Sequence, residues 1–382
     1  MENGKPFESG TFLVSLKEAD LSFCDCAASF LQSGFWGAFK ARFGWEALAF
    51  RAVWKGEGPS EEKPLLVLRR SLAAGGSGIF GFSLAYIPWG PELPAALTNR
   101  EEALHELSLS LKKILPEDTV FLRFDPPWYT QHIGFDEYKA AEKPDAFSPP
   151  FVRSGADIQP PDTVLIDLKQ PMESIIGEMK SKWRYNARLA LKKGVTVRRA
   201  GAEEAGVFYE LLKTTSRRDG IAIHSLEYYQ TILGGVIKSE AIVSRETTDT
   251  RLYLAEHEGE LLAGIVTLFR GREAVYLYGA SSDKKRSLMA PYALQLKAME
   301  DAKEAGCELY DLFGIPPDED PSHPMAGLYR FKTGFGGKIV HRPGSWDFPY
   351  RPLVYRLFRG AETLRKNLRT IKKRIKKLPA PS

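Results

Sequence analysis

Near its C-terminal end the chain reads Gly327-Leu-Tyr-Arg-Phe-Lys-Thr-Gly-Phe-Gly-Gly337. This segment places one lysine, Lys332, between two phenylalanines, Phe331 and Phe335. A lysine beside apolar rings is partly desolvated, so its charge acts strongly on any negative group nearby. The glycines that follow allow the backbone to turn sharply or to approach a ligand closely. The segment predicts a cationic site, and the alternative from these residues alone is an ordinary loop-to-strand junction with a solvated lysine.

Upstream of this segment, the apolar pattern predicts one order of elements twice. In the first half we expect three strands, a helix and a further strand, at about 47–54, 64–69, 79–87, 101–115 and 119–124. In the second half the same order is expected at about 252–256, 260–268, 274–279, 291–306 and 308–313. A three-strand meander, a helix and another strand outline an acetyltransferase-like (GNAT-like) unit. We therefore predict an α/β (α+β) fold of two tandem GNAT-like acyltransferase domains.

Composition restricts the class of protein. At 382 residues the chain is too long for one typical core, and 43% hydrophobic with 26% charged residues is usual for a soluble globular protein. No run approaches the roughly 20 apolar residues that span a bilayer, and the N-terminus lacks the pattern of a signal peptide. Three cysteines argue against a disulfide framework. We expect a cytoplasmic protein.

Positive charge is concentrated in the tail. Residues 356–377 contain ten Lys or Arg and one Glu, a local balance of +9 in a chain of net charge +5, which leaves −4 for the rest. Apolar residues recur among these cations, as in an amphipathic surface helix. Such a tail could contact RNA phosphates or anionic membrane lipid, and the apolar residues favour the membrane.

A second basic cluster falls in a helix predicted over about 172–193. Four cations would share one stripe of that helix: Lys180, Arg184, Arg188 and Lys192. Their repulsion costs roughly 0.2–0.5 kcal/mol per adjacent pair, which a polyanion would relieve, although a solvated basic face is equally compatible. Asn186 is a mediocre helix former, which favours a structural or binding role. Arg184, Asn186 and Arg188 are therefore candidate substrate-binding residues.

The sequence lacks the common motifs of nucleotide binding, metal binding and serine-hydrolase catalysis. There is no Walker loop, no metal-binding His spacing and no Ser/His/Asp order with a supporting motif, so we predict no metal site. The junction after Tyr276 and Tyr278 is where an acetyltransferase would bind the coenzyme A pyrophosphate with a glycine-rich loop. Residues 281–290 offer Asp283, Lys284, Lys285 and Arg286 instead. This composition disfavours an acetyl-CoA enzyme.

Taken in order, several segments resemble the Fem-type (FemABX) peptidoglycan aminoacyltransferases. The matching segments are Phe35-Trp36 with Lys40, 86–91, 121–126, 163–168, 182–195, 276–281, 290–292, 310–315 and 327–337. Each is weak alone, but the order, with Arg-Tyr-Asn and Phe-Lys-x-x-Phe-Gly-Gly both present, is specific. The resemblance implies a first domain of residues 1–160 plus 345–382 and a second of 161–344. The two-helix arm that some members insert has no counterpart here.

The resemblance implies transfer of an amino acid from aminoacyl-tRNA to the stem-peptide amine of a peptidoglycan precursor. The acceptor would be lipid II or UDP-MurNAc-pentapeptide, with aminoacyl-tRNA as co-substrate and no other cofactor. Lys40 and Trp36 would bind the diphosphate-sugar end of the acceptor. A lipid-linked acceptor suits peripheral contact of residues 356–377 with the inner face of the cytoplasmic membrane.

Within the same resemblance, Tyr228, Tyr276 and Tyr278 would line the peptide channel. Phe331 and Lys332 would lie at the transfer centre, where the lysine would stabilise the oxyanion of the tetrahedral intermediate.

One departure concerns the position four residues before Tyr228. Members of the family often carry an arginine there, and this chain has His224, so Arg217 or Arg218 could take over contact with the diphosphate.

Two points stay open. The only protein candidate for a general base is Asp311, and the alternative is assistance by a hydroxyl or phosphate of the tRNA itself. The competing functions are a GNAT-type N-acyltransferase using an acyl-CoA donor and a non-catalytic RNA- or membrane-binding protein.

Overall fold

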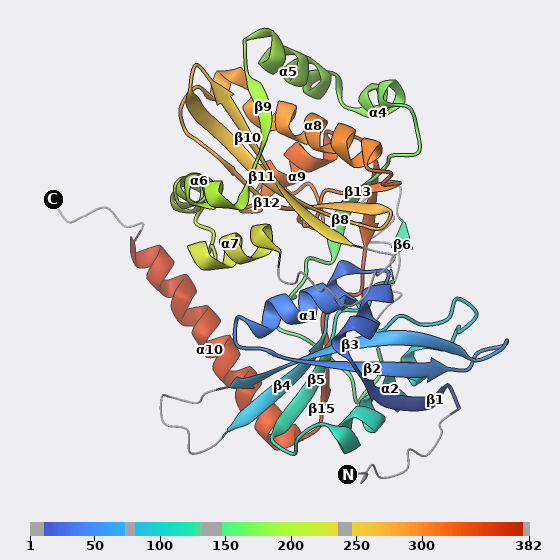
Figure 1. Cartoon of the computed structure of the whole chain (residues 1–382). Helices are drawn as coiled ribbons and strands as arrows, with labels where there is room; N and C mark the ends of the chain where they lie inside the picture. Colours follow the sequence, from blue (N-terminus) through green and yellow to red (C-terminus); the bar gives the residue numbers. More distant parts are fainter. Residues whose placement is uncertain (1–10, 73–80, 129, 132–146, 236–246, 377–382) are drawn as a thin grey trace.

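The computed structural model describes residues 11–72, 81–128, 130–131, 147–235 and 247–376, and its described strands form two sheets (Figure 1). The first sheet has the order β1 (Leu13–Ala19), β2 (Glu46–Trp54), β3 (Glu61–Leu72), β4 (Phe82–Ile87), β5 (Thr119–Phe124), β15 (Trp346–Pro349) and β7 (Val152–Arg153). The second has the order β6 (Thr130–Gln131), β14 (Lys338–His341), β8 (Asp162–Asp167), β13 (Leu309–Asp311), β12 (Glu273–Ser281), β11 (Glu260–Arg270), β10 (Thr248–His257) and β9 (Thr196–Ala200).

Helices cover both sheets. The α-helices are α1 (Gly34–Ala41), α2 (Arg100–Ile114), α4 (Met172–Glu178), α5 (Ser181–Lys192), α6 (Ala205–Asp219), α7 (Leu226–Gly234), α8 (Ala290–Glu304), α9 (Ala326–Thr333) and α10 (Pro352–Lys376). Short 3-10 helices are η1 (Leu21–Cys26), η2 (Phe30–Gln32), η3 (Ala202–Glu204) and η4 (Arg286–Leu288). No described helix combines the length and the apolar character that a bilayer-spanning segment needs.

The two sheets share one arrangement. In the first, β1 to β4 are antiparallel neighbours and α2 leads from β4 to β5, which runs parallel to it. In the second, β9 to β12 are antiparallel neighbours and α8 leads from β12 to the parallel strand β13. An antiparallel meander followed by a helical crossover to a parallel strand is the GNAT-like order. The predicted fold of two tandem GNAT-like units is confirmed.

Two local expectations need correction. The helix predicted over 172–193 is broken into α4 and α5, because Met179 and Lys180 adopt extended ψ angles near 147° and 142°. The guanidinium of Arg184 donates hydrogen bonds to the carbonyls of Gly177 and Met179, which satisfies the end of α4. In addition, β6 lies within the range predicted for the first domain but pairs with β14 of the second sheet.

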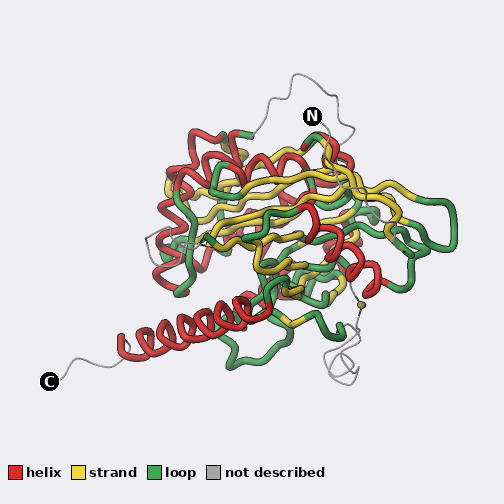
Figure 2. The backbone as a smooth tube through the Cα atoms, turned by 90° about the horizontal axis from the view of Figure 1, so that it is seen from below, coloured by secondary structure: helices red, strands yellow, loops and turns green. Residues whose placement is uncertain are grey.

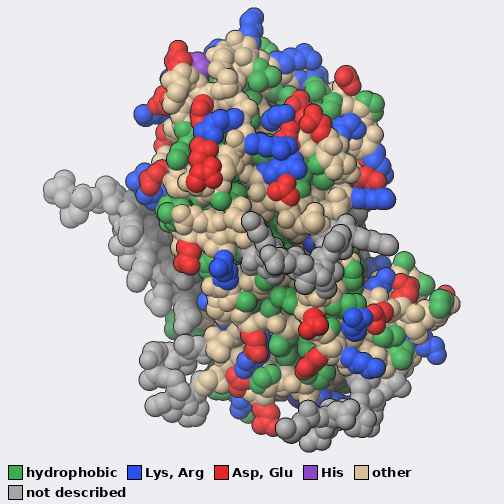
Figure 3. All heavy atoms as spheres, viewed as in Figure 1, with side chains coloured by type: hydrophobic (Ala, Val, Ile, Leu, Met, Phe, Trp, Pro, Cys, Tyr) green, Lys and Arg blue, Asp and Glu red, His purple; other side chains and the backbone are tan. Residues whose placement is uncertain are grey.

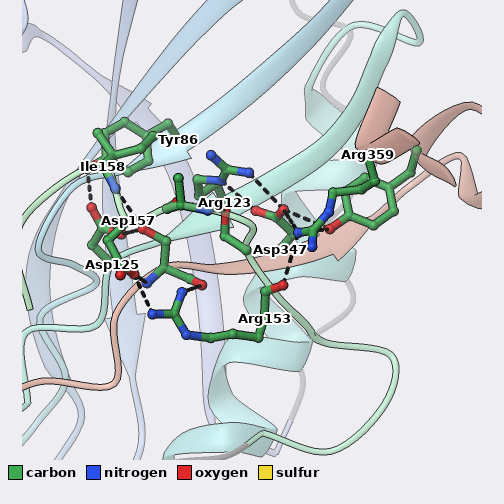
Figure 4. A network of polar contacts seen from close by, with 12 residues as sticks. Tyr86, Arg123, Asp125, Arg153, Asp157, Ile158, Asp347 and Arg359 are labelled. Atoms are coloured by element: carbon green, nitrogen blue, oxygen red, sulfur yellow. Dashed lines mark hydrogen bonds and ion pairs between the residues drawn. The ribbon is translucent and has the colours of Figure 1, made fainter. Parts of the chain in front are cut away.

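The C-terminal segment is fixed to the first sheet by a buried ionic network (Figure 4). Arg123 on β5 donates two hydrogen bonds to the carboxylate of Asp347 on β15, at 2.6 and 2.9 Å. The hydroxyl of Tyr355 on α10 donates to the same carboxylate at 2.8 Å, and Arg359 lies 3.8 Å from it. These charges are buried and paired. Removing one partner would therefore leave the other as an unpaired buried charge and lower the free energy of unfolding. The network sets the direction in which α10 leaves the molecule.

The two units meet through an apolar core. One cluster of buried residues draws members from both, including Phe39 on α1 and Tyr228 on α7, whose ring centroids lie 4.7 Å apart. Figure 1 shows α1 and α7 facing each other between the two sheets. Ring packing therefore contributes to holding the two units in position.

Candidate active site

A cavity of about 1080 Å³ lies in the second unit, where β12 and β13 separate. These parallel strands pair only from Glu273 to Val275, and β12 then continues to Ser281 paired with β11 but without β13 beside it. Separation of parallel strands at their carboxyl ends is a common place for ligands in sheets covered by helices. The cavity is lined by the part of β12 that extends beyond β13, the start of α8, the end of α6 and one face of α9.

Lys332 projects from α9 into this cavity and is only 6% exposed. Its Nζ donates hydrogen bonds to the carbonyls of Phe313 and Gly314, the latter at 2.9 Å. It also lies 5.0 Å from the centroid of the Tyr276 ring, where the negative face of the ring attracts a cation. Burial lowers the pKa of Lys332 to about 7, and the nearby charge of Asp311 opposes this shift. A small change in surroundings therefore changes the charge of Lys332.

The carbonyls that hold Lys332 belong to a turn after β13. Phe313 has a φ of 53°, in the left-handed region that non-glycine residues rarely adopt. Asp311 Oδ1 stabilises this turn by accepting hydrogen bonds from the backbone N–H of Phe313, at 2.7 Å, and from the hydroxyl of Thr163. Asp311 itself is fully buried and does not line the cavity. It supports the lysine indirectly, through the turn and through its charge.

Aromatic rings surround α9. Phe331 lies 5.3 Å from Tyr292 and 5.1 Å from Phe335 between ring centroids, both edge-to-face. Trp183 on α5 donates its indole N–H to the carbonyl of Phe331 at 2.8 Å. The Trp183 ring occupies the space beside Gly334, where a Cβ atom would lie 2.0 Å from it. Glycine is therefore required at 334 for α5 to fix α9.

A second cation, Lys40, lies at the boundary between the units. Its Nζ is 5.5 Å from the ring centroid of Trp36, 5.8 Å from that of Trp45 and 5.7 Å from that of Tyr228. Burial lowers the pKa of Lys40 to about 8, with a further contribution from Arg70. A desolvated cation among aromatic faces, with the exposed Arg70 nearby, is a suitable environment for an anion.

Tyrosines connect Lys40 to the cavity. The imidazole of His224 stacks on the ring of Tyr228, with centroids 3.8 Å apart, and lines the cavity. The hydroxyls of Tyr228 and Tyr278 are 3.1 Å apart, and Tyr278 also lines the cavity. Burial lowers the pKa of His224, and Lys40 adds to this effect. His224 is therefore neutral near pH 7, unlike an arginine at the same position.

A family model of the FemAB family matches this sequence over residues 25–235 and 236–363. The chain belongs to the FemAB family. The matched ranges include Lys40, Tyr228 and Lys332.

Relatives and solved structures agree with this assignment. The chain is similar to Lipid II:glycine glycyltransferase of Staphylococcus epidermidis (24% identical over 253 residues) and of Staphylococcus aureus (25% over 258 residues). Each match covers 52% of this chain and 61% of the relative, so the chain spans less than two thirds of these proteins. The crystal structure of FemX superposes with a TM-score of 0.70 at 21% identity, covering 91% of this chain and all of FemX.

For this FemAB chain, the structure brings most of the predicted site residues together. The cavity is lined by His224, Tyr276, Tyr278, Phe331 and Lys332. Tyr228, Lys40 and Trp36 adjoin it in that order, through the ring contacts given above. Whether these residues bind substrate stays a prediction.

Three predicted residues of this chain lie elsewhere. Arg184, Asn186 and Arg188 are on α5, and the cavity lining does not include them. The Arg184 guanidinium is engaged at the end of α4, Asn186 is buried, and Arg188 is exposed. The interruption at Lys180 also shortens the predicted basic stripe of the helix. A direct substrate contact by these residues therefore has no geometric support.

Sequence reasoning missed several residues that shape the site. Trp183 fixes α9, while Trp45 and Arg70 complete the surroundings of Lys40. Trp183 lies directly beside the Arg-Tyr-Asn motif, so the motif could have suggested it. No sequence signal pairs Trp45 or Arg70 with Lys40. In the part of the chain that the structure describes, no cluster of three His, Cys, Asp or Glu could hold a metal ion.

Proposed function

We propose that this chain transfers an amino acid from aminoacyl-tRNA to the stem-peptide amine of a peptidoglycan precursor, either lipid II or UDP-MurNAc-pentapeptide. Membership of the FemAB family and the names of the relatives support a peptidoglycan aminoacyl transfer. The observation that carries the proposal is the buried ammonium of Lys332 in a cavity lined by tyrosines.

The reaction needs orientation and charge stabilisation more than driving force. The acceptor nitrogen attacks the ester carbonyl, the new C–N bond forms, and the C–O bond to the tRNA ribose breaks. The amine proton ends on the ribose oxygen, which leaves as a hydroxyl. Because an amide is more stable than an ester, the enzyme must align the reactants and stabilise the oxyanion.

Lys332 has the properties that oxyanion stabilisation requires. Its ammonium is held by two backbone carbonyls, so little reorganisation is needed when negative charge develops. Bound anionic substrate and the oxyanion both raise the pKa of Lys332 and keep it charged during the reaction. Asp311, the protein candidate for a base, is fully buried and does not reach the cavity. Proton removal by a hydroxyl or phosphate of the tRNA fits this arrangement better.

Basic side chains at the mouth of the cavity support an RNA-linked donor. They come from the end of α6 and from the loop between β12 and α8: Arg218, Lys284, Lys285 and Arg286. Much of this charge is balanced locally. Arg218 contacts Asp219 and Asp283, and Lys284 and Lys285 form ion pairs with Glu260 and Glu258. Phosphates of an incoming strand would compete for these cations, and such binding weakens as salt rises.

The test is a transfer assay followed by mass spectrometry. The protein is incubated with mixed charged tRNA and either lipid II or UDP-MurNAc-pentapeptide, and the mass increment identifies the added residue. Lys332→Met should lower kcat by about 10²–10³, the effect of losing one oxyanion donor. Lys338→Met, at an exposed lysine on β14, is the matched control and should keep full activity. Full activity of Lys332→Met, or a product formed only with an acyl-CoA donor, would contradict the proposal.

If the acceptor is lipid-linked, the reaction takes place at a membrane surface. We therefore propose peripheral contact with the inner face of the cytoplasmic membrane through the basic segment 356–377, of which residues 356–376 belong to α10 and Lys377 lies outside the described residues.

A further inference from the structure

Helix α10 leaves the first sheet and runs along the outside of the molecule, and its C-terminal half stands away from both sheets (Figures 1 and 2). The helix spans 25 residues, about 37 Å at 1.5 Å per residue. The family match ends at residue 363, so more than ten residues of the helix lie beyond it.

One side of α10 is bound to the molecule. Tyr355 is buried and lies 5.2 Å from the ring of Phe121 on β5, and Phe358 lies 5.1 Å from the same ring. Arg359 donates to the carbonyl of Arg153 at 3.0 Å. These contacts fix the rotation of the helix about its axis. The face opposite to them must therefore point to solvent.

That opposite face is apolar. Leu353, Leu357 and Leu364 are 75%, 75% and 60% exposed. Their spacing of four and seven residues places them on one stripe of the helix, and Gly360 and Ala361, also exposed, lie between them. An isolated exposed leucine needs no explanation, but three on one stripe of one helix leave a continuous apolar surface in water.

The charge of the segment decides which partner fits. Residues 356–377 carry +9, whereas the other residues together carry −4. On the face shown in Figure 3, Lys and Arg are interspersed with Asp and Glu, so the strong positive excess belongs to the tail. A second copy of α10 would bring two such charges together, which opposes pairing through the leucines. A tRNA strand would match the charge but would leave the leucines in water.

We infer that the leucine stripe of α10, formed by Leu353, Leu357 and Leu364, enters the interface of an anionic lipid surface while the flanking cations contact the lipid headgroups. A helix with an apolar stripe and many basic residues lies in the plane of a membrane, held by apolar burial and by attraction to anionic lipid. Because the ionic network around Asp347 fixes α10 on the first sheet, docking of the helix also orients the cavity of the second unit.

Vesicle co-sedimentation of the full chain tests this inference. The wild-type protein should sediment with vesicles containing phosphatidylglycerol and remain in the supernatant with phosphatidylcholine alone. Each Leu→Ser change removes one side chain that the lipid interface would bury, and such a loss lowers partitioning into the membrane about tenfold. The triple variant Leu353→Ser, Leu357→Ser, Leu364→Ser should therefore bind at least about 100-fold more weakly.

The matched control replaces three exposed apolar residues on other helices: Leu109, Leu191 and Val207, each by Ser. It should bind vesicles like the wild type. Both variants should unfold at similar temperatures, because each replaces three exposed apolar residues of helices by serine. Equal vesicle binding by the leucine-stripe variant and the wild type would overturn the inference.

Two other outcomes would replace the lipid surface by another partner. A dimer in sedimentation equilibrium that the leucine-stripe variant converts to a monomer, without vesicle binding, would assign the stripe to a second copy. Loss of tRNA binding in a filter assay, again without vesicle binding, would assign it to RNA. Transfer to UDP-MurNAc-pentapeptide in vesicle-free buffer should be unchanged in the leucine-stripe variant, so failure of the lipid inference is distinguishable from failure of the proposed function.

Discussion

Replacing Lys332 by Met tests the state of the buried ammonium without any substrate. Methionine has a similar length and no charge, so the variant removes the desolvated group with little change in packing. Burial lowers the pKa of Lys332 from 10.5 to about 7. Each unit of this shift corresponds to about 1.36 kcal/mol, so forcing the charge into the folded protein costs about 5 kcal/mol at low pH.

The direction in which pH changes the free energy of unfolding follows from proton uptake on unfolding. Between the folded pKa near 7 and the unfolded value of 10.5, the unfolded chain holds a proton on Lys332 that the folded chain lacks. The free energy of unfolding of the wild type therefore rises with pH in this window, and the penalty is fully present below pH 7. Relative to Lys332→Met, the wild type should gain about 2 kcal/mol between pH 7 and pH 9.

Urea unfolding of both proteins at pH 7 and pH 9 measures this quantity as a difference of differences. The variant also leaves the carbonyls of Phe313 and Gly314 without their ammonium donor, but that cost does not depend on pH and cancels. Lys338→Met, at an exposed position, should show no pH-dependent difference. An equal difference at both pH values for Lys332→Met would mean that the ammonium is solvated, and the argument for oxyanion stabilisation would fail.

Three further predictions concern the surroundings of the two cations. Asp311→Asn removes the charge that raises the pKa of Lys332, so the decline of the transfer rate at high pH should begin at a lower pH. If Asp311 had a purely structural role, the variant would lower the rate equally at all pH values. Lys40→Met should raise the Kd for UDP-MurNAc-pentapeptide about tenfold or more in calorimetry, and wild-type binding should weaken as pH rises through about 8, where Lys40 loses its proton. Trp183→Ala should lower the free energy of unfolding by about 2–4 kcal/mol and also lower kcat, because the indole fills space beside α9 and donates a hydrogen bond to the carbonyl of Phe331. A loss of stability at unchanged kcat would show that Trp183 does not position α9 for transfer.

Much of the fold was accessible from local sequence patterns. The strands β10, β11 and β12 and the helix α8 coincide closely with the expected segments, because short apolar runs and a proline in the first helical turn are local signals. The break between α4 and α5 was not accessible. It depends on the Arg184 side chain folding back onto carbonyls, and an arginine in a helical pattern is normally read as a solvated residue.

The site was predictable in part for the same kind of reason. The flanking rings of Phe331 and Phe335 correctly indicated that Lys332 is desolvated. The groups that hold its ammonium are backbone carbonyls of Phe313 and Gly314, and backbone atoms leave no signature in the choice of side chain. The α5 residues expected to contact substrate do not line the cavity, because charge clustering in a sequence indicates a surface but not the direction in which it faces.

The site depends on both units at once. Lys40 comes from α1 of the first unit, while Tyr228 and the stacked His224 come from the second, and the Phe39–Tyr228 contact joins them. Neither unit alone therefore holds the complete row of rings that leads from Lys40 to the cavity. Since buried aromatic pairs have specific geometries, a shift of one unit against the other would separate Lys40 from the ring of Tyr228. Substitutions in the apolar boundary should consequently change the affinity for the proposed acceptor even where they do not touch Lys40, and in this way the proposed transfer would depend on both units.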